Sequence, residues 1–332
     1  MMIKMHMNHM KKRGGTKMVE STIHATQAVV TLDVALPGII WGWMITLNMW
    51  AKSIGTGVIL VGAFLLYRHK KDEMPNLRWM MPLISFIALN VFLLFTLVDL
   101  HQPLRMVNIF LHPHWTSAIT VGAWMASIFT ALVTLMLAIG VLDAFPDFRR
   151  QCGLAKKVRS KSELYEKVFP FVVFLALPVT MYTAIIMAQA SARELWAAPA
   201  ELVQMLFAAF MVGSASFILI SEKWSAEARR DLALILALSV AFSFTMYMGE
   251  YFFSFKASEV EATLAYVHSG GSYNLQFWSA MVLGYIIPFF VAIGSLKEEN
   301  RTMMKFAAVT TFIGLYLAKS TWLEIPQMIP LS

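Results

Sequence analysis

The sequence predicts an all-α integral membrane protein with eight transmembrane helices. Of its 332 residues, 58% are hydrophobic and 14% are charged, and the mean hydropathy is +0.63, which is too apolar for a water-soluble chain of this size. Eight apolar segments are each long enough to cross a bilayer core of about 30 Å as a helix, which satisfies its own backbone polar groups in lipid. The formal charge of +7 lies mostly in short loops beside these segments, which indicates membrane topology rather than nucleic-acid binding.

The eight spans follow one another with polar connections between them. Their expected positions are residues 39–67, 80–98, 118–142, 168–190, 201–221, 232–253, 275–296 and 303–323. Prolines fall inside two of them, Pro178 in the fourth and Pro288 in the seventh. Membrane helices tolerate proline because neighbouring groups satisfy the freed backbone, so neither proline argues against a spanning helix.

The first span and the fifth share a weak internal sequence repeat. Residues 54–60, IGTGVIL, resemble residues 212–219, VGSASFIL, four spans later. Small residues at this spacing let two helices approach closely, so packing alone would explain them. The placement also predicts two four-helix bundles, residues 37–197 and 198–332, after a polar tail at 1–36 that has no signal-peptide core. Methionines crowd this tail, so translation could begin as late as Met18.

Lysines and arginines are distributed unevenly between the two sets of loops. The loops after the odd-numbered spans contain most of them, whereas the other loops and the end of the last span contain only Arg105, Arg193, Lys256 and Lys319. Because basic loops stay in the cytoplasm, the first set is expected there and both termini are expected outside. The basic residues of the tail argue the other way, but they end about 20 residues before the first span and weigh less.

Histidine and cysteine usage limits the redox centres that this chain can hold. The sole cysteine, Cys152, cannot ligate an iron–sulfur cluster alone, so any such cluster is expected in a partner chain. No histidine falls inside a span, whereas a b-type haem needs axial imidazoles at membrane depth. The chain is therefore expected to carry no haem, no iron–sulfur cluster and no metal ion.

Lys52 is the most unusual residue of the spans, because an ionisable group in lipid costs at least a few kcal/mol and is seldom kept without a partner or a task. Asn48 and Thr56 lie one helical turn on either side of it, on the same helix face. Two interpretations stay open. Lys52 takes part in quinone or proton chemistry, or it pairs with an acid or hydrogen-bonds across the bundle for structure alone.

Polar residues also line one face of the sixth span. Ser243, Tyr247, Glu250 and Tyr251 follow helical spacing and rise toward the predicted outer side. Glu250 is a candidate proton acceptor, because burial raises the proton affinity of a carboxylate. The plain alternative is a glutamate that faces water at the helix end.

The predicted outer ends of the spans carry a polar turn, two charged residues and several tryptophans. The turn at 99–105, DLHQPLR, contains an acid, an imidazole and a guanidinium that could bind a polar head group or relay protons, or else be a capped turn with solvated charges. Lys319 and Glu324 are expected to reach toward the interface. An interfacial aromatic belt is expected to contain Trp41, Trp43, Trp115, Trp196 and Trp322.

Four motifs occur in a fixed order along residues 43–219. They are the glycine-rich end of span one from Gly55 to Leu65, the turn from Asp99 to Arg105, Thr116-Ser117 with Gly122-Ala123-Trp124, and Tyr182 to Ala188 followed by Arg193-Glu194-Leu195-Trp196. In this order and spacing they resemble the polysulfide reductase membrane subunit family, often called NrfD-like. Each motif is loose by itself, but the set is fairly specific.

The resemblance implies an eight-helix subunit of a prokaryotic cell membrane that anchors an iron–sulfur protein and, usually through it, a molybdopterin catalytic subunit. Such subunits exchange two electrons with menaquinol or ubiquinol near the face where the partners dock, and some are proposed to move protons. The quinone-binding tyrosine of the family corresponds to Tyr182, with Gln189 two turns further along. The polar residues of span one correspond to Asn48 and Lys52.

The chain departs from the family pattern in three places. The histidine that some relatives carry in span one is absent, Ala184 replaces the glycine of the tyrosine motif, and His101 stands where a glycine is common. These departures concern the detailed geometry around the quinone.

The resemblance therefore predicts a quinone-reactive membrane subunit of a respiratory oxidoreductase. Tyr182 with Asn48 or Lys52 would bind the quinol oxygens. Candidates for carrying its two protons are Asp99, His101, Tyr247 and Glu250. The outer loops, especially residues 99–115 and 255–274, are expected to face the iron–sulfur partner. Arg105 and Arg193 are expected either to contact this partner or to hold the loops in place.

Two alternative functions stay open. A secondary transporter predicts discontinuous helices at matched positions of the two halves and a chain that works alone. A purely structural anchor predicts only packing roles for Lys52 and Tyr182.

Overall fold

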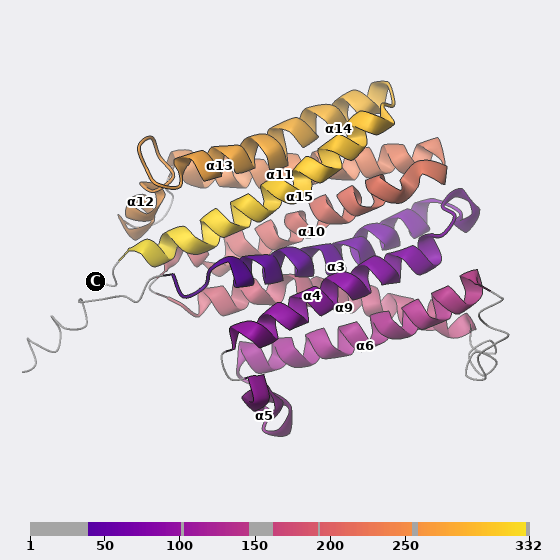
Figure 1. Cartoon of the computed structure of the whole chain (residues 1–332), viewed down its shortest axis with the longest axis horizontal. Helices are drawn as coiled ribbons and strands as arrows, with labels where there is room; N and C mark the ends of the chain where they lie inside the picture. The colour runs from indigo at the N-terminus through magenta and orange to yellow at the C-terminus, as the bar shows by residue number, and fades with distance from the viewer. Residues whose placement is uncertain (1–38, 101–102, 146–161, 192, 254–257, 330–332) are drawn as a thin grey trace, which may run out of the picture. The chain divides into compact units, whose positions relative to one another are not determined.

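The computed structural model describes residues 39–100, 103–145, 162–191, 193–253 and 258–329. His101, Cys152 and the polar tail at 1–36 therefore lie outside the described residues. The spanning helices belong to one compact unit, Trp41–Pro326, in which they run side by side (Figure 1). Across the described residues no strand is present, so the all-α prediction is confirmed.

All eight predicted spans are confirmed as helices that are long and apolar enough to cross a membrane. They are α3 (Trp43–Arg68), α4 (Leu77–Asp99), α6 (Ala118–Ala144), α9 (Ser162–Ala188), α10 (Ala198–Ile220), α11 (Ala226–Phe253), α13 with α14 (Asn274–Met281 and Ile287–Lys297) and α15 (Arg301–Glu324). The fourth and sixth begin several residues before their apolar segments, because polar residues extend each helix out of the apolar region.

Shorter elements that the apolar pattern does not predict occupy the connections. Two of them are short α-helices, α5 (Val107–Leu111) and α12 (Ser258–Leu264). The 3₁₀ turns are η1 (Lys71–Glu73), η2 (Pro103–Met106), η3 (Glu194–Trp196), η4 (Ser221–Lys223) and η6 (Ile325–Met328). Lengths of three to seven residues are too short for the periodicity that reveals a spanning helix.

The seventh span contains one departure from α geometry. A π-helical turn, η5 (Val282–Ile286), lies between α13 and α14. Pro288 explains it, because proline has no N–H for the carbonyl of Gly284 and its ring clashes with that carbonyl in an α-helix. The third span, which stands in the corresponding place of the first half, is an unbroken α-helix over Ala118–Ala144.

Three helices form the interior and the others surround them. Within the apolar stretch of each spanning helix, 72% of the residues are buried in α3 and 67% in α10 and α15. The corresponding share is 33% in α4 and α6. The helix α3 packs against α4, α9, α10 and α15, and α10 packs against α9, α11 and α15. The most buried helices are therefore the ones that can hold polar side chains away from lipid. The division into two bundles at residue 197 stays a prediction.

Close packing of α3 on α10 depends on the small residues of the weak internal repeat. A Cβ on Gly57 would lie 2.0 Å from the carbonyl oxygen of Ala209, and one on Gly213 would lie 2.4 Å from the carbonyl oxygen of Gly57. Only glycine fits at such a helix crossing, so the interpretation that the repeated small residues serve helix packing is confirmed. The seventh and eighth spans repeat the arrangement, because a Cβ on Gly314 would lie 2.0 Å from the backbone nitrogen of Gly284.

Candidate functional site

The central candidate site lies where α3 meets α9. Lys52 is nine residues after the start of α3, about 14 Å along the helix axis, and its side chain is 1% exposed. Its ammonium donates a hydrogen bond to the hydroxyl of Thr183 and lies 4.7 Å from the centroid of the Tyr182 ring. The buried amine of Lys52 is therefore held by one hydroxyl and one aromatic face of the fourth span.

Tyr182 is held on its other side by α6. A Cβ on Gly122 would lie 2.4 Å from the ring of Tyr182, so the tyrosine occupies the space that a side chain at position 122 would need. Gly122 and Tyr182 belong to two of the motifs on which the family resemblance rests. Their contact gives a physical reason for the occurrence of both motifs in one chain.

Asn48 lies one turn before Lys52 and is 6% exposed. Its side-chain amide donates to the carbonyl oxygen of Phe92 at 2.9 Å and to the hydroxyl of Thr96 at 2.5 Å, both on α4. The two amide hydrogens are thus used, and the side-chain oxygen is the group that can still accept a hydrogen bond. Among the predicted ligands, the structure brings together Lys52 and Tyr182 directly, and Asn48 lies on the adjoining turn.

A second set of buried polar groups lies among α10, α11, the seventh span and α15. Ser243 donates to the side-chain oxygen of Gln204 at 2.6 Å, and the amide of Gln204 donates to the carbonyl of Ser243 at 3.2 Å. The ring of Tyr247 lies 5.7 Å from that of Tyr285 and 4.9 Å from that of Trp322. Tyr247, predicted as part of a polar stripe, is therefore in an aromatic cluster that is almost fully buried.

The two sets of residues are close enough to influence each other electrostatically. The amines of Lys52 and Lys319 repel each other, Glu201 attracts Lys319, and Glu201 is also near Tyr247. Glu201 is 5% exposed and Lys319 is 6% exposed. Buried ionisable groups thus extend from the Lys52 site on α3 to Tyr247 on α11.

The burial of Lys319 corrects one sequence-based expectation. The sequence predicts that Lys319 extends to the membrane interface, but the residue is buried, and Glu201 near the start of α10 supplies an opposite charge. Glu324 is half-buried and accepts hydrogen bonds from Tyr273 and Ser320, both at 2.8 Å. Burial, followed by the Glu324 carboxylate, raises the pKa of Tyr273 to about 12.

The expectation of an aromatic belt is wrong for two of its five tryptophans. Trp196 and Trp322 are 4% and 5% exposed, and the indole of Trp196 donates to the carbonyl oxygen of Trp322 at 3.2 Å. Trp41 stacks on Trp196 with ring centroids 5.3 Å apart. Trp43 and Trp115 are more than half exposed, as an interfacial position requires.

The remaining predicted residues lie outside the central site. Gln189 follows the end of α9 and is exposed, Asp99 is the last residue of α4 and is half-buried, and Glu250 is half-buried on α11, three residues after Tyr247. Arg105 is exposed in η2, and Arg193 is 8% exposed just before η3. Their functional roles stay predictions, and His101 lies outside the described residues.

Sequence reasoning missed several partners that the structure supplies. Thr183 lies in the tyrosine motif, yet a threonine in an apolar span carries no signal that identifies it as the partner of a lysine. Thr96 is similar. Glu201 could have been found, because an acid at the start of an apolar span also costs energy, but pairing it with Lys319 across the fold requires the tertiary structure.

The site can donate and accept hydrogen bonds at membrane depth. An ammonium, a phenol, a threonine hydroxyl and an amide oxygen lie within two adjoining turns of α3 and the facing turn of α9. These groups suit the oxygens of a lipid-soluble carbonyl compound, and a protonated lysine can stabilise negative charge that develops on such an oxygen.

Comparison with known proteins gives one family. The family model described as Polysulphide reductase, NrfD matches residues 34–330. No curated protein matches the chain significantly. The match extends past Leu219, where the motif resemblance ends, and it includes every described spanning helix.

Proposed function

Because the chain belongs to the polysulphide reductase NrfD family, we propose that this multi-pass membrane protein is the quinone-reactive subunit of a respiratory oxidoreductase. Members of this family work with iron–sulfur and molybdenum subunits. In the proposal the protein lies in a prokaryotic cell membrane, with both termini outside, and it anchors such partners at its outer loops.

The observation that carries the proposal is the placement of Lys52. A lysine that is 1% exposed between two spanning helices, bonded to Thr183 and set against Tyr182, has no carboxylate among its described contacts. A quinone oxygen is a suitable acceptor for such a group. Tyr182 can donate its phenolic hydrogen, and Asn48 can accept a hydrogen bond from a quinol hydroxyl.

The chemistry of the quinol determines which electrons and protons the protein has to transfer. Oxidation of a quinol to a quinone releases two electrons and two protons. The electrons go to the iron–sulfur partner, and the protons leave through ionisable side chains of this chain, with quinone reduction as the reverse. In the proposal, a proton moves between α3 and α11 through a buried set of ionisable residues, which are Lys52, Lys319, Glu201 and Tyr247. Asp99 and Glu250 would carry protons nearer the predicted outer surface.

Isolation of the native complex tests the proposal. The protein is purified with its partners in mild detergent, and menaquinol or ubiquinol is added while the iron–sulfur clusters are followed by electron paramagnetic resonance. We expect quinol to reduce the clusters, and Tyr182→Phe to slow this reduction about tenfold. Tyr67→Phe, at a residue that is 91% exposed, is the matched control and should leave the rate unchanged.

Two results would contradict the proposal. One is a chain that purifies without any redox partner and transports a solute by itself. The other is a complex in which neither quinol nor quinone exchanges electrons with the clusters. The transporter alternative predicts matched breaks in both halves, but the π-helical turn of the seventh span has no counterpart in α6, so no observation favours it.

A further inference from the structure

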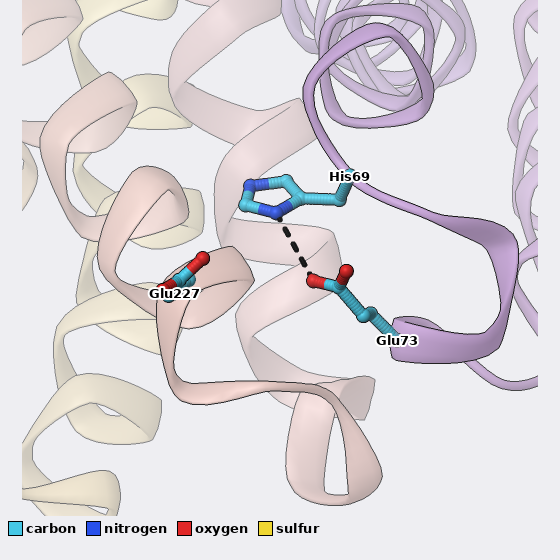
Figure 2. Close-up of side chains that lie close together, drawn as sticks. All are labelled: His69, Glu73 and Glu227. Atoms are coloured by element: carbon cyan, nitrogen blue, oxygen red, sulfur yellow. Dashed lines mark ion pairs between the residues drawn. The ribbon is translucent and has the colours of Figure 1, made fainter.

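A cluster of one histidine and two glutamates lies at the opposite end of the helices from the predicted outer loops. His69 follows α3, Glu73 ends η1, and Glu227 is in the first turn of α11. One ligand-type atom of each residue lies within 4.8 Å of the others. Figure 2 shows the three side chains converging from these separate segments.

The imidazole is buried and oriented by a carboxylate. The side chain of His69 is 6% exposed, and its Nε2 lies 3.0 Å from a carboxylate oxygen of Asp231, which Arg68 also contacts at 2.7 Å. An imidazole that gives its Nε2 hydrogen to a carboxylate presents the lone pair of Nδ1 on its other side. This arrangement, with a carboxylate behind the ring, is the usual setting of a metal-binding histidine.

Glu73 is positioned by contacts with the start of α11. Its Oε2 accepts a hydrogen bond from the hydroxyl of Ser225 at 3.2 Å, and its carbonyl oxygen accepts from the backbone of Ser225 at 2.9 Å. The indole of Trp224 donates to the carbonyl of Pro75 at 3.2 Å. The loop after α3 and the beginning of α11 are thus fixed to each other before any ligand binds.

The contact between His69 and Glu73 has the spacing of two ligands on one metal ion. The distance from Nδ1 to Oε2 is 3.3 Å, drawn as the dashed line in Figure 2. A charge-assisted hydrogen bond between these atoms would be about 2.8 Å long. The edge between two ligands of a tetrahedral zinc ion with bonds of 2.0–2.1 Å is about 3.3 Å.

The two carboxylates of the cluster have no lysine or arginine partner among the described residues, so a cation would be favourable there. Arg68 offsets Asp231, which leaves Glu73 and Glu227 beside one imidazole, and Glu227 has no ion pair among the described residues. A proton on Nδ1 would supply one positive charge to a single contact. A divalent ion would satisfy both carboxylates and the nitrogen lone pair together.

We propose that His69, Glu73 and Glu227 bind a divalent transition-metal ion of the Zn²⁺ type, with water completing the coordination. Imidazole and carboxylate ligands suit such ions, and the exposure of Glu227 beside the half-buried Glu73 leaves access for water. The ion would join the loop between the first two spans to the start of the sixth. This proposal departs from the expectation of a metal-free chain, and it does not depend on the proposed quinone chemistry.

Zinc binding by the full-length protein in mild detergent tests the proposal. Equilibrium dialysis against Zn²⁺ measures the number of ions and their affinity for the unchanged chain, for Glu227→Gln and for Glu298→Gln. Glu298 is an exposed glutamate with no ion pair among the described residues, which makes it the matched control. Histidines of the tail at 1–36 are the same in all three chains, so binding to them cancels in the comparison.

We expect Glu227→Gln to lose one tightly bound zinc ion per chain, with an affinity at least tenfold weaker, and Glu298→Gln to retain it. Asp231→Asn, which keeps all three ligands and removes the carboxylate charge shared by His69 and Arg68, should weaken binding about 10- to 100-fold. Zinc should also raise the melting temperature of the unchanged chain more than that of Glu227→Gln. Equal zinc binding and an equal thermal shift in these two chains would overturn the proposal.

Discussion

The Nζ atom of Lys52 lies 4.7 Å from the centre of the Tyr182 ring, so the amine of the first span is held against an aromatic face of the fourth. Few arrangements keep a charge so deep in a membrane protein, because the cost of removing it from water has to be offset by contacts. Hydrogen bonding to Thr183 and the electron-rich ring face offset only part of this cost. A ligand oxygen would complete the environment of the lysine.

Replacing Lys52 by methionine tests this role. Methionine keeps the length of the side chain and removes the charge, so helix packing should persist while stabilisation of a quinone oxygen is lost. We expect quinol-dependent turnover of the assembled complex to fall between about 10- and 100-fold, as for loss of a group that stabilises developing charge. Lys167→Met, at an exposed lysine near the start of α9, is the control and should have no effect.

Substitution of Gly122 tests whether the position of the Tyr182 ring matters. In Gly122→Ala the new methyl group would lie 2.4 Å from the ring, so the ring has to move away from its place beside Lys52. We expect a lower rate of quinol oxidation together with intact assembly, measured by turnover and by co-purification of the partner subunits. Normal turnover in a fully assembled Gly122→Ala complex would show that the quinone does not use this ring.

The fold was largely predictable, and the reason is the length of its helices. Each spanning helix must present about 20 apolar residues to lipid, and this produces a signal that local sequence determines. The π-helical turn at Val282–Ile286 was not predicted, although Pro288 two residues later marks the place. The short helices α5 and α12 have five and seven residues, which is too short for apolar periodicity to reveal them.

The candidate site was predictable only in part. Lys52 and Tyr182 stand out because a charge in an apolar span and a family motif are both visible in sequence. Thr183 and Thr96 became evident only when the helices were brought together, since their pairing with Lys52 and Asn48 depends on helix crossing. The sequence favours Lys319 as an interfacial residue that extends toward water, whereas in the structure it is buried with Glu201 of another helix as the opposite charge.

The contact between Gly57 and Gly213 predicts a large effect of one methyl group. A Cβ at position 57 would lie 2.0 Å from the carbonyl oxygen of Ala209, and the backbone of α10 cannot yield as a flexible side chain would. We expect Gly57→Ala to lower the free energy of unfolding by about 1–3 kcal/mol, measured by tryptophan fluorescence during heating in detergent. Gly294→Ala, at a helical glycine with nothing within 4 Å of the added carbon, should differ little from the unchanged chain.

Lys319 and Glu201 should behave as one interacting pair. Removing either charge leaves the other buried, so Lys319→Met and Glu201→Gln should each lower the melting temperature. In the double variant we expect the loss to be smaller than the sum of the single losses, with a coupling free energy of about 1–3 kcal/mol. Strict additivity in the double-mutant cycle would mean that the two side chains do not interact.

The Arg229–Glu299 contact makes stability depend on pH at the end of the fold opposite the predicted outer loops. Arg229 donates to both carboxylate oxygens of Glu299, at 2.5 and 2.9 Å, and these hydrogen bonds hold the pKa of Glu299 below its ordinary value of 4.5. The folded state therefore binds this proton less tightly than the unfolded state, so the stabilisation is complete above about pH 5 and is lost as the pH falls through the lowered pKa. Melting temperatures measured between pH 7 and pH 3 should decline less steeply for Glu299→Gln than for the unchanged chain. Glu298→Gln, at the neighbouring exposed glutamate, should keep the original slope, and identical slopes in all three chains would show that the contact contributes no stability.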